Sequence, residues 1–200
     1  PAWTVFLLLP AAPVIGLAFR GRGPGSAPFL AAAISGFCGI VAEVSLLVAY
    51  QMLAGAFYFS IALLSGFFMA GLAGGAYLRE RLGKAAGMNR LSMALVAYSA
   101  AIIFTVGRLS ADQLPPSLLL FVFSFAMLVQ GIVTGAIFAA AAAADAAGPG
   151  EVGRSAGRIN GADHLGGAVG GLVVGIVLIP LQGIMFSLAA ALAMALSLAL

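Results

Sequence analysis

The sequence predicts an all-α, polytopic transmembrane helical bundle, and three observations support this fold class. Of the 200 residues, 63% are hydrophobic and 8% are charged, whereas soluble domains carry about 25% charged residues. Apolar stretches close to the roughly 20 residues that cross a bilayer recur along the chain. The 27 glycines suit close packing of helices in a membrane. These features exclude a water-soluble fold of this size.

Seven apolar runs predict about seven spans. Glycine, proline, serine and charged residues separate the runs and mark the turns. The runs cover residues 3–19, 28–53, 57–78, 91–107, 117–142, 159–179 and 184–200. Residues 1–26 then form a first span with its loop, and residues 27–200 a six-helix membrane domain. Both ends of the sequence lie in apolar stretches, so we expect this chain to be a piece of a longer polypeptide.

The basic residues predict the orientation. Arginine and lysine accumulate in cytoplasmic loops. With the N-terminus outside and the C-terminus inside, eight basic residues fall on the inner side: Arg20, Arg22, Arg79, Arg81, Lys84, Arg90, Arg154 and Arg158. Arg108 alone falls on the other side. This pattern favours a multi-pass protein of a bacterial-type inner membrane. Basic residues scattered over several short loops make a poor nucleic-acid surface, so lipid is the expected partner.

Glycines at spacings of four predict helix contacts. Gly71 and Gly75 form one such pair, Gly131 and Gly135 a second, and the sixth run carries Gly167, Gly171 and Gly175. Residues four apart share one helix face, and small residues there let two backbones approach closely. We interpret these rows as packing surfaces.

Glu43 is the one acidic residue in the apolar stretch 27–59. An ionised carboxylate at the centre of a bilayer costs about 2.5–3.5 kcal/mol on insertion scales. Ser35 and Gly39 precede it on the same helix face, and Gln130 and Thr134 lie at a similar depth on the fifth run. Two interpretations stay open. Glu43, Gln130 and Thr134 form a cation or proton site, or a protonated Glu43 bonds Gln130 and joins two helices.

A second polar cluster begins the sixth run and contains Arg154, Arg158, Asn160, Asp163 and His164. Counting back from Pro180 places it at the cytoplasmic end, where an Arg–Asp pair would clamp the sixth helix. Asp163 is on the row of Gly167 and should face a neighbouring helix. Cys38 and His164 are the only residues of their types. They exclude a thiolate metal site and a bis-histidine haem, so we expect no metal and no cofactor.

Two segments resemble membrane-embedded spermidine-synthase-like proteins. The first is Ser35-Gly-Phe-Cys-Gly-Ile-Val-Ala-Glu43 together with residues 66–81 on the next span. The second is Gly153-Arg-Ser-Ala-Gly-Arg158, followed by the glycines from 166 and by Ile179-Pro180. The family implies a transporter-like membrane domain fused to a cytoplasmic aminopropyltransferase. These 200 residues contain no such catalytic domain, which would lie outside them. The chain departs from the family at Asp163 and His164, where the family has an Asn-Thr pair.

The loop Arg79-Glu-Arg-Leu-Gly-Lys84 resembles the signature loop of major facilitator transporters. This likeness implies that the last six helices correspond to one transporter half. We therefore expect a module that binds or transports a small cation such as a polyamine. The alternative is a non-catalytic anchoring subunit of a larger membrane complex, possibly a redox complex with cofactors on other chains. A fused cytoplasmic domain or other membrane subunits are the expected partners.

Overall fold

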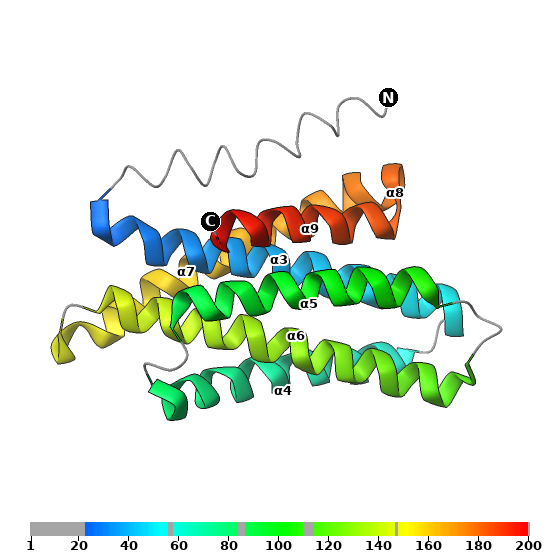
Figure 1. The fold of residues 1–200 in the computed structure, drawn as a ribbon, viewed down its shortest axis with the longest axis horizontal. Helices are drawn as coiled ribbons and strands as arrows, with labels where there is room; N and C mark the ends of the chain where they lie inside the picture. Colours follow the sequence, from blue (N-terminus) through cyan, green and yellow to red (C-terminus); the bar gives the residue numbers. More distant parts are fainter. Residues whose placement is uncertain (1–22, 56–57, 84–86, 110–113, 147, 200) are drawn as a thin grey trace.

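The computed structural model describes residues 23–55, 58–83, 87–109, 114–146 and 148–199. Nearly all of them are helical (Figure 1). The elements are α3 Gly23–Ala54, α4 Tyr58–Leu82, α5 Met88–Arg108, α6 Pro116–Asp145, the 3₁₀ turn η2 Pro149–Glu151, α7 Val152–Leu172, the π-helical η3 Val173–Leu178, α8 Ile179–Gln182 and α9 Ile184–Ala199. The predicted first span, residues 3–19, lies outside the described residues.

Five helices in the described part of the chain are long and apolar enough to cross a membrane. They are α3, with its apolar segment Ala27–Ala54, then α4, α5, α6 and the continuous run Val152–Gln182. The seventh predicted run forms α9, which has 16 residues and falls short of the usual 20. The prediction of an all-α helical bundle is therefore confirmed, and five of the seven predicted spans have the length and composition that crossing a membrane requires.

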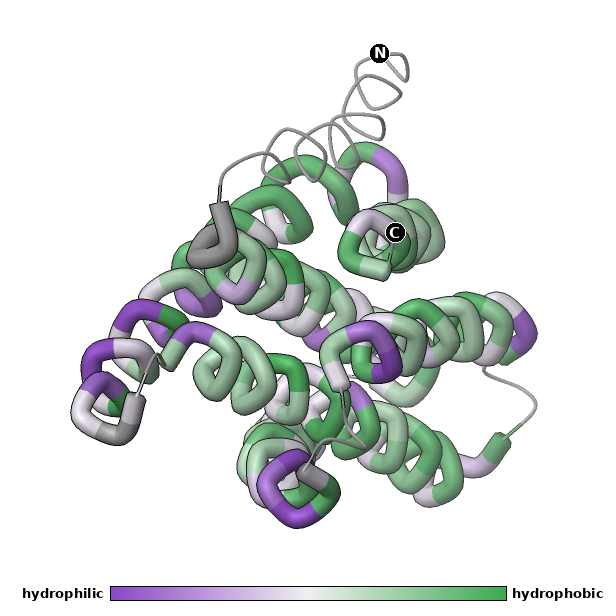
Figure 2. The backbone as a smooth tube through the Cα atoms, turned by 60° about the vertical axis from the view of Figure 1, so that its left-hand side comes forward, coloured by the Kyte–Doolittle hydropathy of each residue, from purple (hydrophilic) through white to green (hydrophobic). Residues whose placement is uncertain are grey.

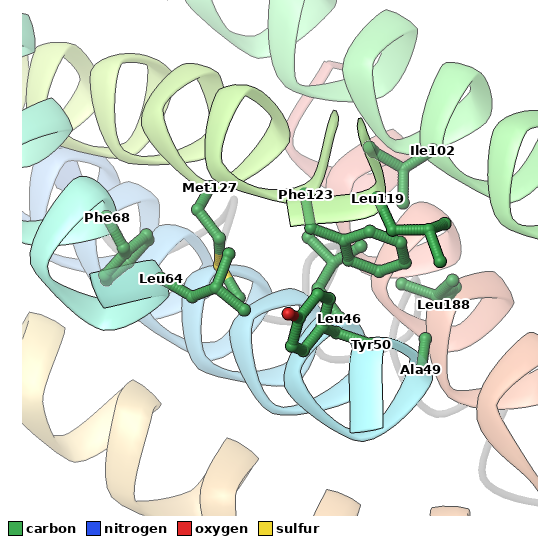
Figure 3. Packing of buried hydrophobic residues seen from close by; sticks show 10 residues of the cluster. All are labelled: Leu46, Ala49, Tyr50, Leu64, Phe68, Ile102, Leu119, Phe123, Met127 and Leu188. Atoms are coloured by element: carbon green, nitrogen blue, oxygen red, sulfur yellow. The ribbon is translucent and has the colours of Figure 1, made fainter. Parts of the chain in front are cut away.

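Helices α3 and α6 form the centre of the bundle, while α4 and α7 flank them. The spanning segment of α3 is 67% buried, whereas that of the α7 run is 17% buried. Helix α4 packs on α6, α7 packs on α3, and α5 packs with α9 (Figure 1). The largest core cluster joins α3, α4, α5, α6 and α9 (Figure 3), and within it the rings of Tyr50 and Phe123 meet edge to face at 5.6 Å.

The sixth predicted span is longer than expected at both ends. The run predicted at 159–179 begins earlier, at Val152, directly after η2, which ends at Glu151. At its other end the helix continues past Pro180 to Gln182 and turns at Gly183, whose φ is +85°. A proline lacks the N–H that an α-helix requires. The π-helical turn before it, in which Ile179 N–H bonds Val174 O, rearranges the backbone bonding there.

Two of the predicted glycine rows pack against each other. Gly71 and Gly75 of α4 lie on Gly131 and Ile132 of α6, and a Cβ on Gly71 would lie 2.9 Å from the Gly131 Cα. The third row is partly wrong. Gly167 and Gly171 meet the side chain of Ile40, and the nearest backbone atom to a Cβ on Gly167 is the Gly36 carbonyl oxygen at 3.8 Å. Nothing lies within 4 Å of a Cβ on Gly175.

The closest contact between α7 and α3 uses Gly166 and Gly170 instead. A Cβ on Gly166 would collide with the carbonyl oxygen of Ala33, and one on Gly170 would lie 3.0 Å from that of Phe37. Sequence spacing could not separate this row from the parallel row one residue later. Only the crossing of α7 over α3 selects the face in contact.

These contacts reveal an inverted internal repeat of 95 residues. Gly71 against Leu128 matches Gly166 against Ala33, and Gly75 against Ile132 matches Gly170 against Phe37. The outer helices agree as well: the Ser92 hydroxyl donates to Met88 O, and the Ser187 hydroxyl donates to Gly183 O, at 3.0 Å in both cases. Helices α3–α5 therefore correspond to α6, the α7 run and α9. Each unit has three helices. Because three is an odd number, the helices of the second unit run through the bundle in the direction opposite to those of the first.

The charged residues gather at the helix ends, while the helix bodies are mostly apolar (Figure 2). The C-terminal end of α4 and the N-terminal ends of α5 and α7 meet at one end of the bundle (Figure 1), with five arginines: Arg79, Arg81, Arg90, Arg154 and Arg158. Arg108 ends α5 at the opposite end. The predicted separation of basic residues is thus seen in the described part of the chain, where Arg20, Arg22 and Lys84 are not included.

Candidate functional site

Glu43 is buried at the centre of the bundle. It lies on α3, the helix with the most buried spanning segment, and is 8% exposed. Its Oε1 accepts a hydrogen bond of 3.1 Å from the Ser65 hydroxyl on α4. A single hydroxyl donor leaves most of the acceptor capacity of a carboxylate unused. Ser65 could not be predicted as the partner of Glu43, because the spacing of residues along two consecutive helices does not show which of their side chains meet.

Gln130 and Thr134 lie on α6 and are 1% and 3% exposed. The Gln130 amide nitrogen donates to Thr134 Oγ1 at 3.4 Å, while Gln130 Oε1 is buried without a hydrogen-bond partner. Ser35, which precedes Gln130 by one repeat length, also has a buried hydroxyl without a partner. Such groups are uncommon in folded proteins and are candidates for ligand contacts.

The structure places Glu43 and Gln130 at the same depth, as predicted. A Cβ on Gly39 would lie 3.5 Å from Thr134 Oγ1, which brings these two positions level. Helices α3 and α6 run in opposite directions (Figure 1). One turn after Gly39 on α3 is Glu43, and one turn before Thr134 on α6 is Gln130, so Glu43 and Gln130 are also level with each other. The hydrogen bonds described above, however, join Glu43 to Ser65 and Gln130 to Thr134.

A cavity of about 580 Å³ lies beside this group, between α4 and α7 and over the crossing of α3 and α6. We call it the axial cavity. It is lined by Gly36, Gly39, Ile40, Phe68, Met69, Leu72, Thr134, Asp163, His164, Gly167 and Ala168. It includes Thr134 but not Glu43, so it ends one helical turn short of the buried glutamate.

Asp163 faces α3, as its place on the Gly167 row predicts. A Cβ on Gly36 would collide with the backbone carbonyl oxygen of Asp163 and lie 2.8 Å from its Oδ1, so the glycine makes room for both the backbone and the carboxylate. Asp163 Oδ1 is buried without a hydrogen-bond partner. Asp163 Oδ2 lies 3.7 Å from His164 Nδ1, and the His164 side chain is 72% exposed. The position of Gly36 shows how deep Asp163 lies. Gly36 is four to five residues from the middle of the α3 segment Ala27–Ala54, so Asp163 lies about 7 Å from that middle along the helix axis.

The remaining members of the predicted polar cluster lie apart from Asp163, near the end of the bundle. Arg158 forms an ion pair with Asp145, which ends α6 and whose side chain is 5% exposed. Arg154 lines a small polar cleft with both of these residues, and Asn160 is exposed. An Arg–Asp clamp on this helix therefore exists, but its acid is Asp145, which sequence analysis did not single out.

No cluster of three or more metal-ligating side chains occurs among the described residues. Cys38 is buried, and its thiol contacts the Ala191 carbonyl oxygen at 3.4 Å. The chemistry that the described residues offer is therefore that of carboxylates, a carboxamide and hydroxyls in apolar surroundings.

Comparison with known proteins adds no family to this picture. No protein-family model matches the chain, and no curated protein or solved structure matches it.

Proposed function

We propose that this chain is a membrane module that binds or transports a small cation, with Glu43 as the counter-charge. The supporting observation is the burial of Glu43 with one hydroxyl partner, at the level of a glutamine whose oxygen has none. A carboxylate in apolar surroundings favours a visiting cation or proton. Carbonyl and hydroxyl oxygens, as on Gln130 and Thr134, are suitable neutral ligands. Polyamines are the leading class of cation because of the likeness to spermidine-synthase-like membrane domains.

The inverted repeat supports the same proposal. Many secondary transporters are built from such repeats and bind their substrates near the bilayer midplane where the repeats meet. Glu43, Gln130 and Thr134 lie on α3 and α6, the two helices at this interface. In the proposed orientation the arginine-rich end is cytoplasmic, in a bacterial-type inner membrane. The six helices would then correspond to one half of a major-facilitator-type transporter.

The experiment is uptake of radiolabelled spermidine into proteoliposomes. Glu43→Gln keeps the shape of the side chain and removes its charge, so uptake should be lost. Glu151→Gln is the matched control because Glu151 is exposed at the end of the bundle. Equal uptake by the wild type and Glu43→Gln would eliminate the proposal.

The second candidate is an anchoring subunit of a larger membrane complex. One observation favours it: the axial cavity ends short of Glu43, and α7 leaves most of its apolar surface uncovered. Cross-linking in membranes distinguishes the two. A stoichiometric partner along α7, together with spermidine uptake no greater than that of protein-free liposomes, would support the anchor.

A further inference from the structure

The axial cavity lies on the symmetry axis of the inverted repeat. Gly39 and Thr134 are one repeat length apart and face each other at its base. The walls are also related, because Phe68 and Leu72 on α4 correspond to Asp163 and Gly167 on α7. The two halves of the fold thus build one enclosure from equivalent positions.

Asp163 differs in chemical type from the residue at the equivalent position of the first repeat. Its symmetry mate, Phe68, is 3% exposed and contributes to the apolar core. At the equivalent position in the second half, the chain places a carboxylate that lines the cavity. Its Oδ1 is buried against Gly36, and its Oδ2 lies 3.7 Å from His164 Nδ1. A purely structural position would tolerate an apolar side chain there, as the first half does. The second half instead gives the cavity one charged wall and one aromatic wall.

We propose that the axial cavity binds a small organic ammonium ion with an apolar body, and that Asp163 supplies its counter-charge. The carboxylate at Asp163 and the hydroxyl of Thr134 would accept hydrogen bonds from the ammonium group. Phe68, Leu72 and Ile40 would contact the apolar body, and an aromatic ring favours a cation close to its face. A cavity of about 580 Å³ is within the range of small-molecule sites.

This inference rests on the proposed function for the charge of the ligand, and deepens it by naming a chemical class and a site. The site shares Thr134 with the proposed Glu43 site but has a different carboxylate. Gly36, which Asp163 contacts, precedes Glu43 by seven residues on α3, or about 10 Å along the helix. Each carboxylate can therefore be tested without the other.

The test uses 2-phenylethylammonium as the probe and uncharged 2-phenylethanol as its matched analogue. Binding is measured by isothermal titration to the protein in phosphatidylglycerol nanodiscs, with empty nanodiscs subtracted for partition into lipid. The wild type should bind the ammonium probe and discriminate against the alcohol. Asp163→Asn should weaken binding about tenfold or more, since hydrogen bonds to charged groups are the strong ones.

A second variant keeps the test decisive if Asp163→Asn fails to fold. Ala168 is exposed at the wall of the cavity, so Ala168→Phe should block the probe without disturbing the core. Ala73→Phe is the matched control, because Ala73 is the symmetry mate of Ala168 and is exposed outside the cavity. It should bind like the wild type.

Equal binding of the two probes, or unchanged binding in both Asp163→Asn and Ala168→Phe, would overturn the inference. Loss of probe binding in Glu43→Gln with none in Asp163→Asn would also overturn it, while leaving the proposed function in place. Conversely, unchanged spermidine uptake in Glu43→Gln would end the proposed function but not this site. Repeating the titration with phosphatidylethanolamine identifies the source of the ligand: competition indicates an aminolipid headgroup, and no competition indicates a free amine.

Discussion

Gly39 and Thr134 face each other where α3 crosses α6, with 3.5 Å between Thr134 Oγ1 and the position of a Cβ on Gly39. They are 95 residues apart, the length of the internal repeat, so this contact lies on the symmetry axis of the fold. Both residues line the axial cavity, and the buried glutamate lies one helical turn beyond them. The relationship therefore connects both proposed sites to the architecture.

The two glycine contacts should be equally intolerant of a side chain. Gly71→Ala and Gly166→Ala each place a methyl group against the backbone of a neighbouring helix, at Leu128 and Ala33 respectively. Backbone cannot move aside as a side chain can, and overpacking costs about 1–3 kcal/mol. Unfolding in mixed detergent micelles should show both losses.

Gly74→Ala and Gly161→Ala are the controls, because nothing lies within 4 Å of a Cβ at either position. They should leave stability unchanged or raise it by up to about 1 kcal/mol, since alanine favours helix more than glycine. A destabilising Gly71→Ala beside a neutral Gly166→Ala would contradict the structural equivalence of the two repeats.

The Arg158–Asp145 ion pair should stabilise the junction of α6 and α7. Asp145→Asn removes the charge that faces Arg158, whose side chain is 51% exposed. Because one partner is in contact with water, we expect a coupling free energy of about 1 kcal/mol, which falls as salt is added. A double-mutant cycle with Arg158→Gln measures it, and a coupling of zero at low salt would show that the pair has no energetic role.

The hydroxyl of Ser65 should stabilise the buried position of Glu43. Ser65→Ala removes the donor to Glu43 Oε1, and interhelical hydrogen bonds in membrane proteins contribute about 0.6 kcal/mol on average. The loss of unfolding free energy should disappear in a Glu43→Leu background, where there is no acceptor. An equal loss in both backgrounds would assign the effect of Ser65→Ala to packing instead.

The arginine-rich end of the bundle should face the cytoplasm. Leu82 ends α4 at that end, and Ser117 is exposed at the start of α6 at the opposite end. Single cysteines at these positions, in a Cys38→Ala background, are treated in intact cells with a membrane-impermeant maleimide. Ser117→Cys should be labelled and Leu82→Cys protected until the cells are lysed. The reverse labelling would invert the proposed topology.

Much of the fold could be predicted from the sequence because it depends on local composition. Apolar runs and polar breaks located α3 to α6 closely. They were less accurate for α7, which begins at Val152 rather than at residue 159, and for α9, which is shorter than a usual span. The pairing of Gly71 with Gly131 could not be predicted. Glycine spacing shows that one face of a helix is lined by small residues, but it does not show which helix packs against that face.

For the candidate site, the sequence alone determined that Glu43 is a charge within an apolar span, and that Gln130 lies at a similar depth with Thr134 one turn on. These conclusions need only helix length, because depth follows from the rise per residue. Tertiary structure decided the partners: Ser65 for Glu43, Asp145 for Arg158, and Gly36 for Asp163. It also decided that the cavity lies at Asp163 and Thr134 rather than at Glu43. Such contacts depend on how the helices cross. Helices that are apolar on all sides have no hydrophobic periodicity from which the face in contact could be predicted.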